Sequence, residues 1–180
     1  MNRIAGLLVL ALFSLQACQP EVKEEQEIEL GFADDFSEAW ERSKIYTLAL
    51  ADSMPAELYS YKPSEDVFTF SKQLTHTIDF AGGQLMGQGL IEKSPFSGRK
   101  WEVYTKAQVI ESLTELYDFV DSVVKVIPDA ELAKTINFMG QEVPAFRVFQ
   151  AIENHTIHHR GQALIYMRMN GITPPGYAGW

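Results

Sequence analysis

Apolar side chains recur every three or four residues in four long stretches of the chain, which is the spacing of one buried face of an α-helix. The clearest stretch lies between Thr105, a residue type that favours the N-cap, and Pro128, which a helix interior does not tolerate. We expect the four helices over about 34–54, 67–91, 106–127 and 144–170. Four long amphipathic helices with little strand content predict an all-α protein, a four-helix bundle.

The starts of the first two helices carry several candidate caps. Asp34, Asp35 and Ser37 can cap the first helix, and Ser64 and Glu65 stand where they can cap the second. Each of these side chains offers an oxygen to the free N–H groups of a first helical turn. The helix starts are therefore predicted at these residues.

The connections between the helices are longer than in a minimal up-and-down bundle. They leave room for one or more crossovers, so the hydrophobic pattern alone does not determine the topology. Between residues 134 and 143 apolar and polar side chains alternate, as in a strand. A short hairpin or extended excursion is therefore expected before the last helix.

The first 17 residues are typical of an export signal, with one Arg and then an apolar run too short to span a bilayer. Leu15 to Cys18 resemble a bacterial lipobox, in which cleavage precedes the cysteine and Cys18 is lipidated. A plain secretory signal cleaved nearby is the alternative. Residues 18–30 then form a flexible acidic tether, and residues 31–180 form the folded domain. The expected location is the cell envelope, with the chain anchored to a bacterial membrane through Cys18.

Composition and charge exclude some classes of function. A hydrophobic fraction of 46% and a charged fraction of 22% suit one globular domain. The formal net charge is −9, and it becomes −10 if residues 1–17, which include Arg3, are removed. Lys and Arg are not clustered, so no nucleic-acid partner is expected. Cys18 is the only cysteine, so a lipidated chain has no thiolate for catalysis or metal binding.

Three of the four histidines lie within the segment ENHTIHHRGQ of the last predicted helix. At about 100° per residue, His155 and His159 share one helix face with Gln162, while Arg160 lies on the opposite side, where charged groups are expected to meet water. His158 falls at the edge of the buried arc. Two imidazoles one turn apart can bind one metal ion, whereas two buried histidines without partners would carry an uncompensated desolvation cost.

A third metal ligand must come from another helix, and His76 is the only histidine left. Its helix contains Gly82, Gly83 and Gly87, although glycine destabilises a helix interior by about 1 kcal/mol relative to alanine. Small residues there would let a neighbouring helix approach closely or keep a pocket open over a metal ion. The alternative is that the histidines only pack or cap. Three histidines without cysteine are more typical of a catalytic than of a structural metal site.

The segments LTHTIDF and ENHTIHHRGQALIYMRMNGITPPGY resemble the DinB family, the DinB/YfiT-like metal-binding four-helix bundles. The resemblance runs from about residue 32 to 177. It implies a bundle in which His76, His155 and His159 hold a divalent ion, commonly zinc or nickel. Family members of known activity include thiol-dependent transferases and isomerases. The lipobox departs from relatives in the cytosol, where small thiols are concentrated, and so weakens the case for a transferase.

Three further side chains are candidates to support the metal ligands. Gln162 can orient a ligand or a bound water, His158 can lie at a helix interface or hydrogen-bond near the site, and Asp79 can accept a hydrogen bond from a ligand imidazole. A solvated carboxylate is the alternative for Asp79. Arg160 is expected in a surface or interhelical ion pair.

The leading functional hypothesis is a metal-dependent hydrolase or transferase that acts on a small molecule through a three-histidine site with an open coordination position. The alternative is a lipid-anchored metal-binding or interaction module without catalysis. A DNA-associated stress protein conflicts with the acidity and with export. A homodimer is compatible with each of these hypotheses.

Overall fold

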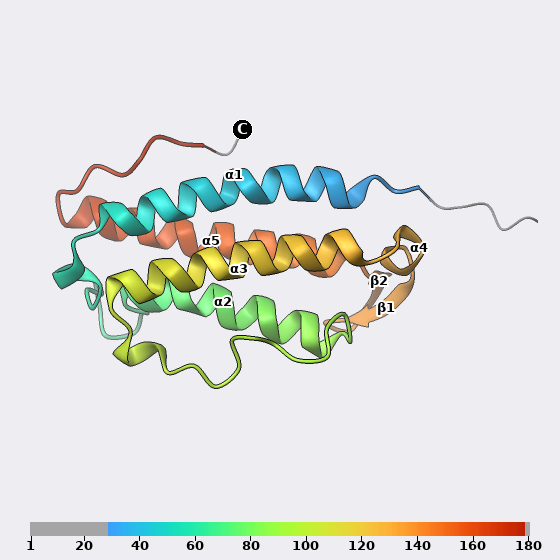
Figure 1. Cartoon of the computed structure of the whole chain (residues 1–180). Helices are drawn as coiled ribbons and strands as arrows, with labels where there is room; N and C mark the ends of the chain where they lie inside the picture. The colour runs from blue at the N-terminus through green and yellow to red at the C-terminus, as the bar shows by residue number, and fades with distance from the viewer. Residues whose placement is uncertain (1–28, 179–180) are drawn as a thin grey trace, which may run out of the picture.

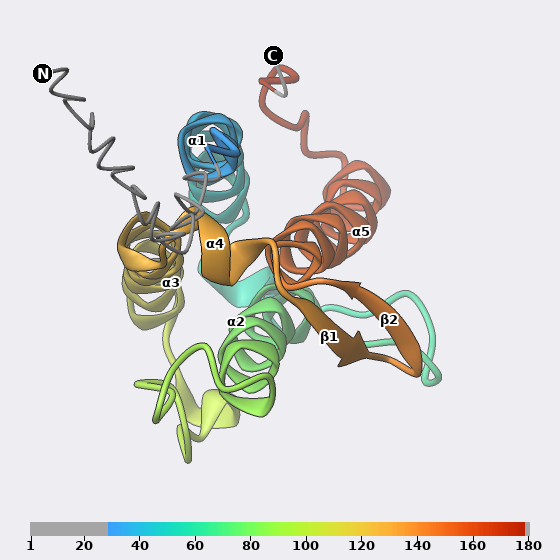
Figure 2. The same cartoon turned by 90° about the vertical axis from the view of Figure 1, so that its right-hand side faces the viewer.

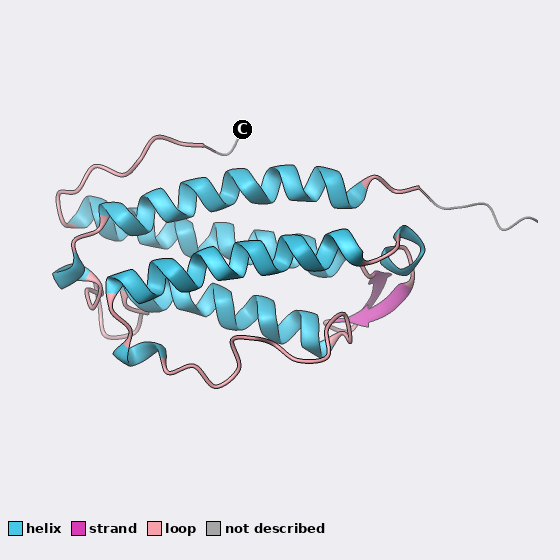
Figure 3. Ribbon diagram, viewed as in Figure 1, coloured by secondary structure: helices cyan, strands magenta, loops and turns pink. Residues whose placement is uncertain are grey.

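Four long helices lie alongside one another and form a bundle in the computed structural model, which describes residues 29–178 (Figures 1 and 3). They are α1 (Phe32–Ser53), α2 (Phe70–Gly87), α3 (Lys106–Val126) and α5 (Arg147–Met169). The shorter elements are η1 (Ala56–Leu58), η2 (Trp101–Val103), α4 (Asp129–Leu132), β1 (Thr135–Phe138) and β2 (Gln141–Pro144). The predicted all-α bundle with a hairpin before the last helix is confirmed. The predicted signal peptide, Cys18 and nearly all of the tether lie outside the described residues.

One long crossover sets the topology. Figure 1 shows α2 and α3 running in the same direction, with α1 and α5 antiparallel to them. The connection between α2 and α3, residues 88–105, must therefore return along the length of the bundle, and η2 lies on this return. Helix α2 packs against α5 and α3, and α1 packs against α3 and α5. The face that α2 shares with α5 is where the histidines meet.

Caps were predicted for the starts of three helices, and the prediction is correct for one of them. Thr105 caps α3 with a complete capping box, in which the Gln108 side chain accepts a hydrogen bond from the backbone N–H of Thr105. Helix α2 is capped by Thr69, and not by Ser64 or Glu65 as predicted. Helix α1 begins after Gly31, whose φ of 61° favours glycine, so the predicted caps within 34–37 lie inside the helix.

The hairpin β1–β2 is closed by a tight turn. The two strands pair antiparallel, and the two residues between them, Met139 and Gly140, both have positive φ, as in a type I′ turn. The backbone twist of such a turn matches the right-handed twist of the two strands that it joins. Figure 2 shows the hairpin projecting beside the first turn of α5.

Aromatic side chains fill the interface between α1 and α3. Trp40 is 1% exposed, and its indole N–H donates a 3.0 Å hydrogen bond to the carbonyl oxygen of Tyr117. The Tyr117 hydroxyl lies 3.2 Å from Ser43 Oγ and 2.7 Å from Thr47 Oγ1, which satisfies three buried hydroxyl groups at once.

Arg160 completes this hydroxyl cluster from α5, which corrects the sequence prediction. It was placed on the solvent face of its helix, but only 7% of its surface is exposed. Its guanidinium donates to the carbonyl oxygen of Ser43, to Ser43 Oγ and to Thr47 Oγ1 at 3.3, 2.7 and 3.1 Å. The predicted ion pair is thus replaced by interhelical hydrogen bonds to neutral groups. The side of α5 opposite the histidines is buried against α1, so the helix has two buried faces.

The glycines of α2 do not open space for a neighbouring helix or a metal ion, as the sequence had suggested. A Cβ on Gly82 would collide with Ser94 Oγ and lie 3.1 Å from Ser94 Cβ. The absence of a side chain at Gly82 therefore lets the crossover loop pack directly against α2. A Cβ on Gly83 or Gly87 would meet no atom of the described part of the chain within 4 Å. Only Gly82 is therefore required by packing.

Candidate metal centre

Three histidines converge where α2 packs against α5. One ring nitrogen from each of His76, His155 and His159 lies within 4.8 Å of the other two. The ring centroids are 4.5 Å apart for His155 and His159, 4.9 Å for His76 and His159, and 5.1 Å for His76 and His155. The structure thus brings together the three side chains that the sequence singled out. Their role as metal ligands stays a prediction.

Each helix presents these imidazoles for a simple geometric reason. His155 and His159 are four residues apart on α5, so they lie one above the other on one face. His76 lies on α2, and the packing of α2 on α5 places it opposite that pair. His159 is buried, and His155 and His76 are half-buried. The cluster therefore lies at the edge of the core.

Gln73 fixes the orientation of His159, and the sequence did not identify this role. Its Oε1 lies 2.6 Å from Nδ1 of His159. Its Nε2 donates to Gln162 Oε1 at 2.8 Å and to the Tyr166 hydroxyl at 2.9 Å. Because the amide nitrogen donates to these acceptors, Oε1 must accept a hydrogen bond from the Nδ1–H of His159, which leaves Nε2 of that ring as the basic nitrogen. Gln73 lies three residues before His76 on the same helix face. This position is the feature of the sequence that could have indicated a role for Gln73 near the histidines.

Gln162 and His158 lie beside the cluster, and the His158 ring centroid is 4.9 Å from that of His159. Gln162 Nε2 is 2.7 Å from Nε2 of His158, an exposed residue, while Gln162 Oε1 accepts from Gln73. Neither side chain hydrogen-bonds one of the three clustered histidines among the described residues. Gln162 thus supports Gln73, which in turn holds His159.

Asp79 interacts with Trp101 and Lys72. Its Oδ1 accepts a 2.8 Å hydrogen bond from the Trp101 indole, and its Oδ2 lies 3.6 Å from Lys72 Nζ. No hydrogen bond joins it to a histidine in residues 29–178, so the suggested contact with a ligand imidazole is not formed. The carboxylate instead ties α2 to η2.

The three imidazoles are neutral at ordinary pH. Burial and the neighbouring His76 and His158 lower the pKa of His155 to about 4. Burial and the neighbouring His155, His76 and His158 lower the pKa of His159 to about 4. Burial and Lys72 also lower the pKa of His76, against an opposing effect of Asp79. Neutral rings carry the free lone pairs that metal coordination requires.

The residues present fit a divalent metal ion. His155 Nε2 is buried and has no hydrogen-bond partner among the described residues, although a buried ring nitrogen normally has one. The donor set of three neutral imidazoles suits zinc or nickel. His76, His155 and His159 could therefore hold one ion, and this ion could be the partner that Nε2 of His155 lacks.

Two phenyl rings flank the cluster. Phe80 stacks on His155 with 3.7 Å between ring centroids and 14° between ring planes. Phe68 lies on the segment before α2, with its ring centroid 5.2 Å from that of His76 and 6.2 Å from that of His159. Phe68 is 43% exposed. Apolar rings from α2 and from the segment before it therefore contact all three histidines.

Within residues 29–178, every helix is too short or too polar to cross a membrane. A sequence profile of the DinB superfamily matches residues 39–163, a span that includes all four histidines.

Two proteins of Bacillus subtilis (strain 168) are similar to the chain in sequence. The uncharacterized protein YrdA is 29% identical over 148 residues, which cover 81% of this chain and 87% of YrdA. The uncharacterized protein YjoA is 28% identical over 133 residues, which cover 71% of this chain and 83% of YjoA.

Two solved structures share the fold. A DinB-like protein from Bacillus cereus ATCC 10987 aligns with a TM-score of 0.67 and 20% identity, over 80% of this chain and 96% of that one. The DinB-like protein YjoA from Bacillus subtilis aligns with a TM-score of 0.64 and 20% identity, over 80% and 97% of the two chains.

Proposed function

The chain belongs to the DinB superfamily, and on that premise we propose that His76, His155 and His159 bind one divalent metal ion, zinc or nickel. The observation that carries the proposal is the convergence of one ring nitrogen from each of the three histidines within 4.8 Å. In addition, Nε2 of His155 is buried without a hydrogen-bond partner among residues 29–178. The pKa of each of the three rings is lowered, which supports the proposal because protons then compete less for the nitrogens near neutral pH.

We further propose that the site is catalytic and acts on a small molecule, as a hydrolase or a thiol-dependent transferase. An ion with three protein ligands keeps a position for water or substrate and serves there as a Lewis acid. Gln73 holds His159 in one tautomer, and the phenyl rings of Phe68 and Phe80 pack against His76 and His155. The predicted export favours the hydrolase.

A metal-binding module without catalysis is the second candidate, and one observation favours it. The group of potential ligand side chains in residues 29–178 contains no carboxylate beside the three histidines. A general base is normally within hydrogen-bond reach of the proton that it removes. The exposed imidazole of His158 is left free by the proposed ligation, and its ring centroid lies 4.9 Å from that of His159.

Metal analysis of the purified full-length chain tests the metal site. We expect one divalent ion per chain in the wild type and less than about a tenth of that in His155→Ala, because removal of one ligand of three eliminates most of the affinity. His158→Ala is the matched control, since it removes a neighbouring histidine that is not a proposed ligand, and it should keep the ion. Equal metal content in the wild type and His155→Ala would refute the site.

Anchoring through Cys18 is a separate proposal that rests on the lipobox alone. Lipidation of Cys18 would hold the folded domain at a membrane of the cell envelope. The wild type should then fractionate with membranes, and Cys18→Ala should not. A Cys18→Ala variant that stays with the membranes would show that lipid on this cysteine is not the anchor.

A further inference from the structure

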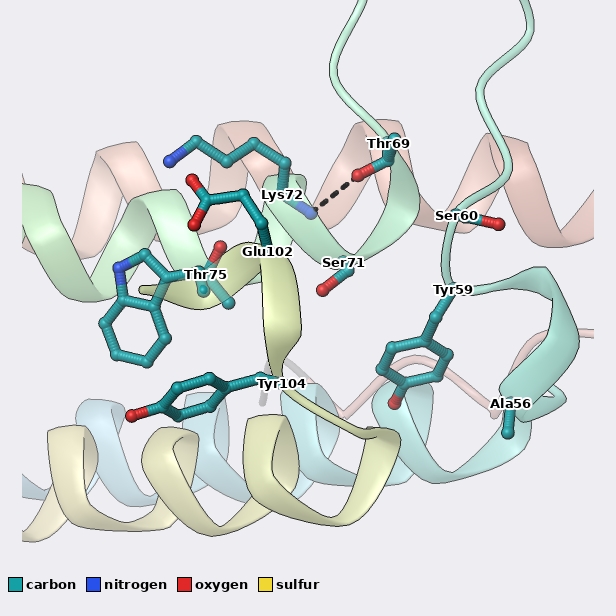
Figure 4. A pocket seen from close by; sticks show the side chains of 10 residues that line it. Ala56, Tyr59, Ser60, Thr69, Ser71, Lys72, Thr75, Glu102 and Tyr104 are labelled. Atoms are coloured by element: carbon teal, nitrogen blue, oxygen red, sulfur yellow. Dashed lines mark hydrogen bonds between the residues drawn. The ribbon is translucent and has the colours of Figure 1, made fainter. Parts of the chain in front are cut away.

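A cavity of about 470 Å³ lies on another side of α2, apart from the histidines. It is open to solvent on one side and is lined by the first half of α2, by η1 with the residues that follow it, and by η2 on the crossover (Figure 4). None of the three clustered histidines lines it. Its size is within the range of about 300–1,000 Å³ that is typical of small-molecule sites.

Two tyrosines line the cavity from different sides. Figure 4 shows Tyr59 on the side of Ser60, while the Tyr104 side chain extends away from Tyr59 and lies below Thr75. The Tyr59 hydroxyl donates to the carbonyl oxygen of Ala51, and burial raises the pKa of Tyr59, so this ring is a neutral and fixed part of the wall. The part of the cavity between the two tyrosines suits a flat or bulky apolar group.

The cavity wall also carries one positive and one negative side chain. Figure 4 shows that Lys72 and Glu102 extend side by side, away from Tyr59. Lys72 Nζ lies 3.6 Å from Asp79, a distance that leaves donors free, and Glu102 forms no ion pair within residues 29–178. An ammonium and a carboxylate presented together complement the opposite charges of a zwitterionic head group.

Thr75 is a polar residue of the cavity wall whose hydroxyl group is not hydrogen-bonded within residues 29–178. Its side chain is fully buried in the wall, and Oγ1 has no hydrogen-bond partner among the described residues. Buried hydroxyl groups in folded proteins are nearly always hydrogen-bonded, to protein, water or ligand.

We propose that this cavity binds a small zwitterion with an apolar body, of the class of the aromatic α-amino acids. The carboxylate of the ligand pairs with Lys72, its ammonium pairs with Glu102, and its ring lies between Tyr59 and Tyr104. The site requires no metal ion and stands independently of the proposed function.

Calorimetric titration of the full-length chain with L-phenylalanine tests the proposal. We expect a dissociation constant of about 1 mM or lower. Phenethylamine lacks the carboxylate and 3-phenylpropionate lacks the ammonium, so each should bind about tenfold more weakly. Because amino acids also chelate metal ions, the titration is repeated with His155→Ala in the presence of a chelator. Binding there should equal that of the wild type, and its loss would place the ligand on the histidines and overturn the proposal.

Variants identify the residues that hold the ligand. Lys72→Met and Glu102→Gln should each weaken L-phenylalanine binding about tenfold, while Lys125→Met and Glu111→Gln, two exposed side chains of α3, should leave it unchanged. Ser71→Phe fills the cavity and should abolish binding, and thermal melting shows whether that variant is folded. Absence of heat with the wild type at 10 mM ligand, or equal binding by Lys72→Met, Glu102→Gln and the two controls, would contradict the assignment.

Discussion

Nδ1 of His159 lies 2.6 Å from Oε1 of Gln73, and this contact joins α5 to α2 at the edge of the three-histidine cluster. The direction of the bond follows from the other end of the amide, where Nε2 of Gln73 donates to Gln162 and Tyr166. His159 is thereby held with its other nitrogen as the acceptor. A histidine that is fixed in this way does not have to reorient when it binds a metal ion.

Replacement of Gln73 by leucine should weaken metal binding about 10- to 100-fold, because the ring of His159 loses the partner that sets its tautomer. Competition with a chromophoric chelator measures the affinity. Gln84→Leu, on the same helix and without these contacts, is the control and should bind as the wild type does. If Gln73→Leu also binds like the wild type, Gln73 does not position the ligand.

Arg160 should contribute to stability rather than to metal binding. In Arg160→Ala the hydrogen bonds to Ser43 and Thr47 are lost and a cavity forms between α1 and α5, so the free energy of unfolding should fall by about 2–3 kcal/mol. Urea denaturation of the metal-free protein measures this change. Arg168→Ala, at an exposed position of the same helix, should change it by less than about 0.5 kcal/mol. Similar values for the two variants would mean that the buried contacts do not stabilise the fold.

The two adjacent glycines of α2 should respond to alanine in opposite directions. Gly83→Ala should stabilise the protein by about 0.5–1 kcal/mol, because the new methyl group meets no atom and alanine favours the helix. Gly82→Ala should destabilise it, because the methyl group displaces Ser94 of the crossover loop. Thermal unfolding compares the two variants. A stabilised Gly82→Ala would show that the loop moves aside at little cost.

The metal-free protein should lose stability as the pH falls from about 6.5 to about 4. In this window His155 and His159, whose pKa values are about 4 in the folded chain, stay largely neutral, while the unfolded chain takes up protons near its ordinary pKa of about 6.5. The unfolded state therefore binds more protons, and its free energy falls relative to that of the folded state.

After allowance for solvent screening, the loss should be about 1–2 kcal/mol across the window, with little further change from these two groups below pH 4 or above pH 7. Urea denaturation in the presence of a chelator at several pH values measures it. His155→Gln should flatten the dependence, since glutamine does not titrate. An unchanged slope in this variant would assign the effect to other groups.

The sequence by itself determined the four helices, the hairpin before α5 and the shared face of His155 and His159. These features follow from local periodicity and local turn chemistry: apolar spacing defines a helix face, and residues four apart must lie one above the other. Thr105 illustrates this, because its capping box involves only residues within one turn. The pairing with His76 was predicted in two ways, because His76 is the only other histidine and because the two histidine segments resemble the DinB family.

Only the tertiary structure decided which side chains from different helices meet. The sequence assigned Arg160 to solvent because a helical projection assumes one buried face, whereas α5 packs against α2 on one side and against α1 on the other. Gln73 could be placed near His76, but its bond to His159 depends on how α5 lies across α2. The need for glycine at position 82 arises from its contact with Ser94 of the crossover loop, which forms only in the folded chain. Such contacts join residues far apart in the chain, and local periodicity carries no information about them.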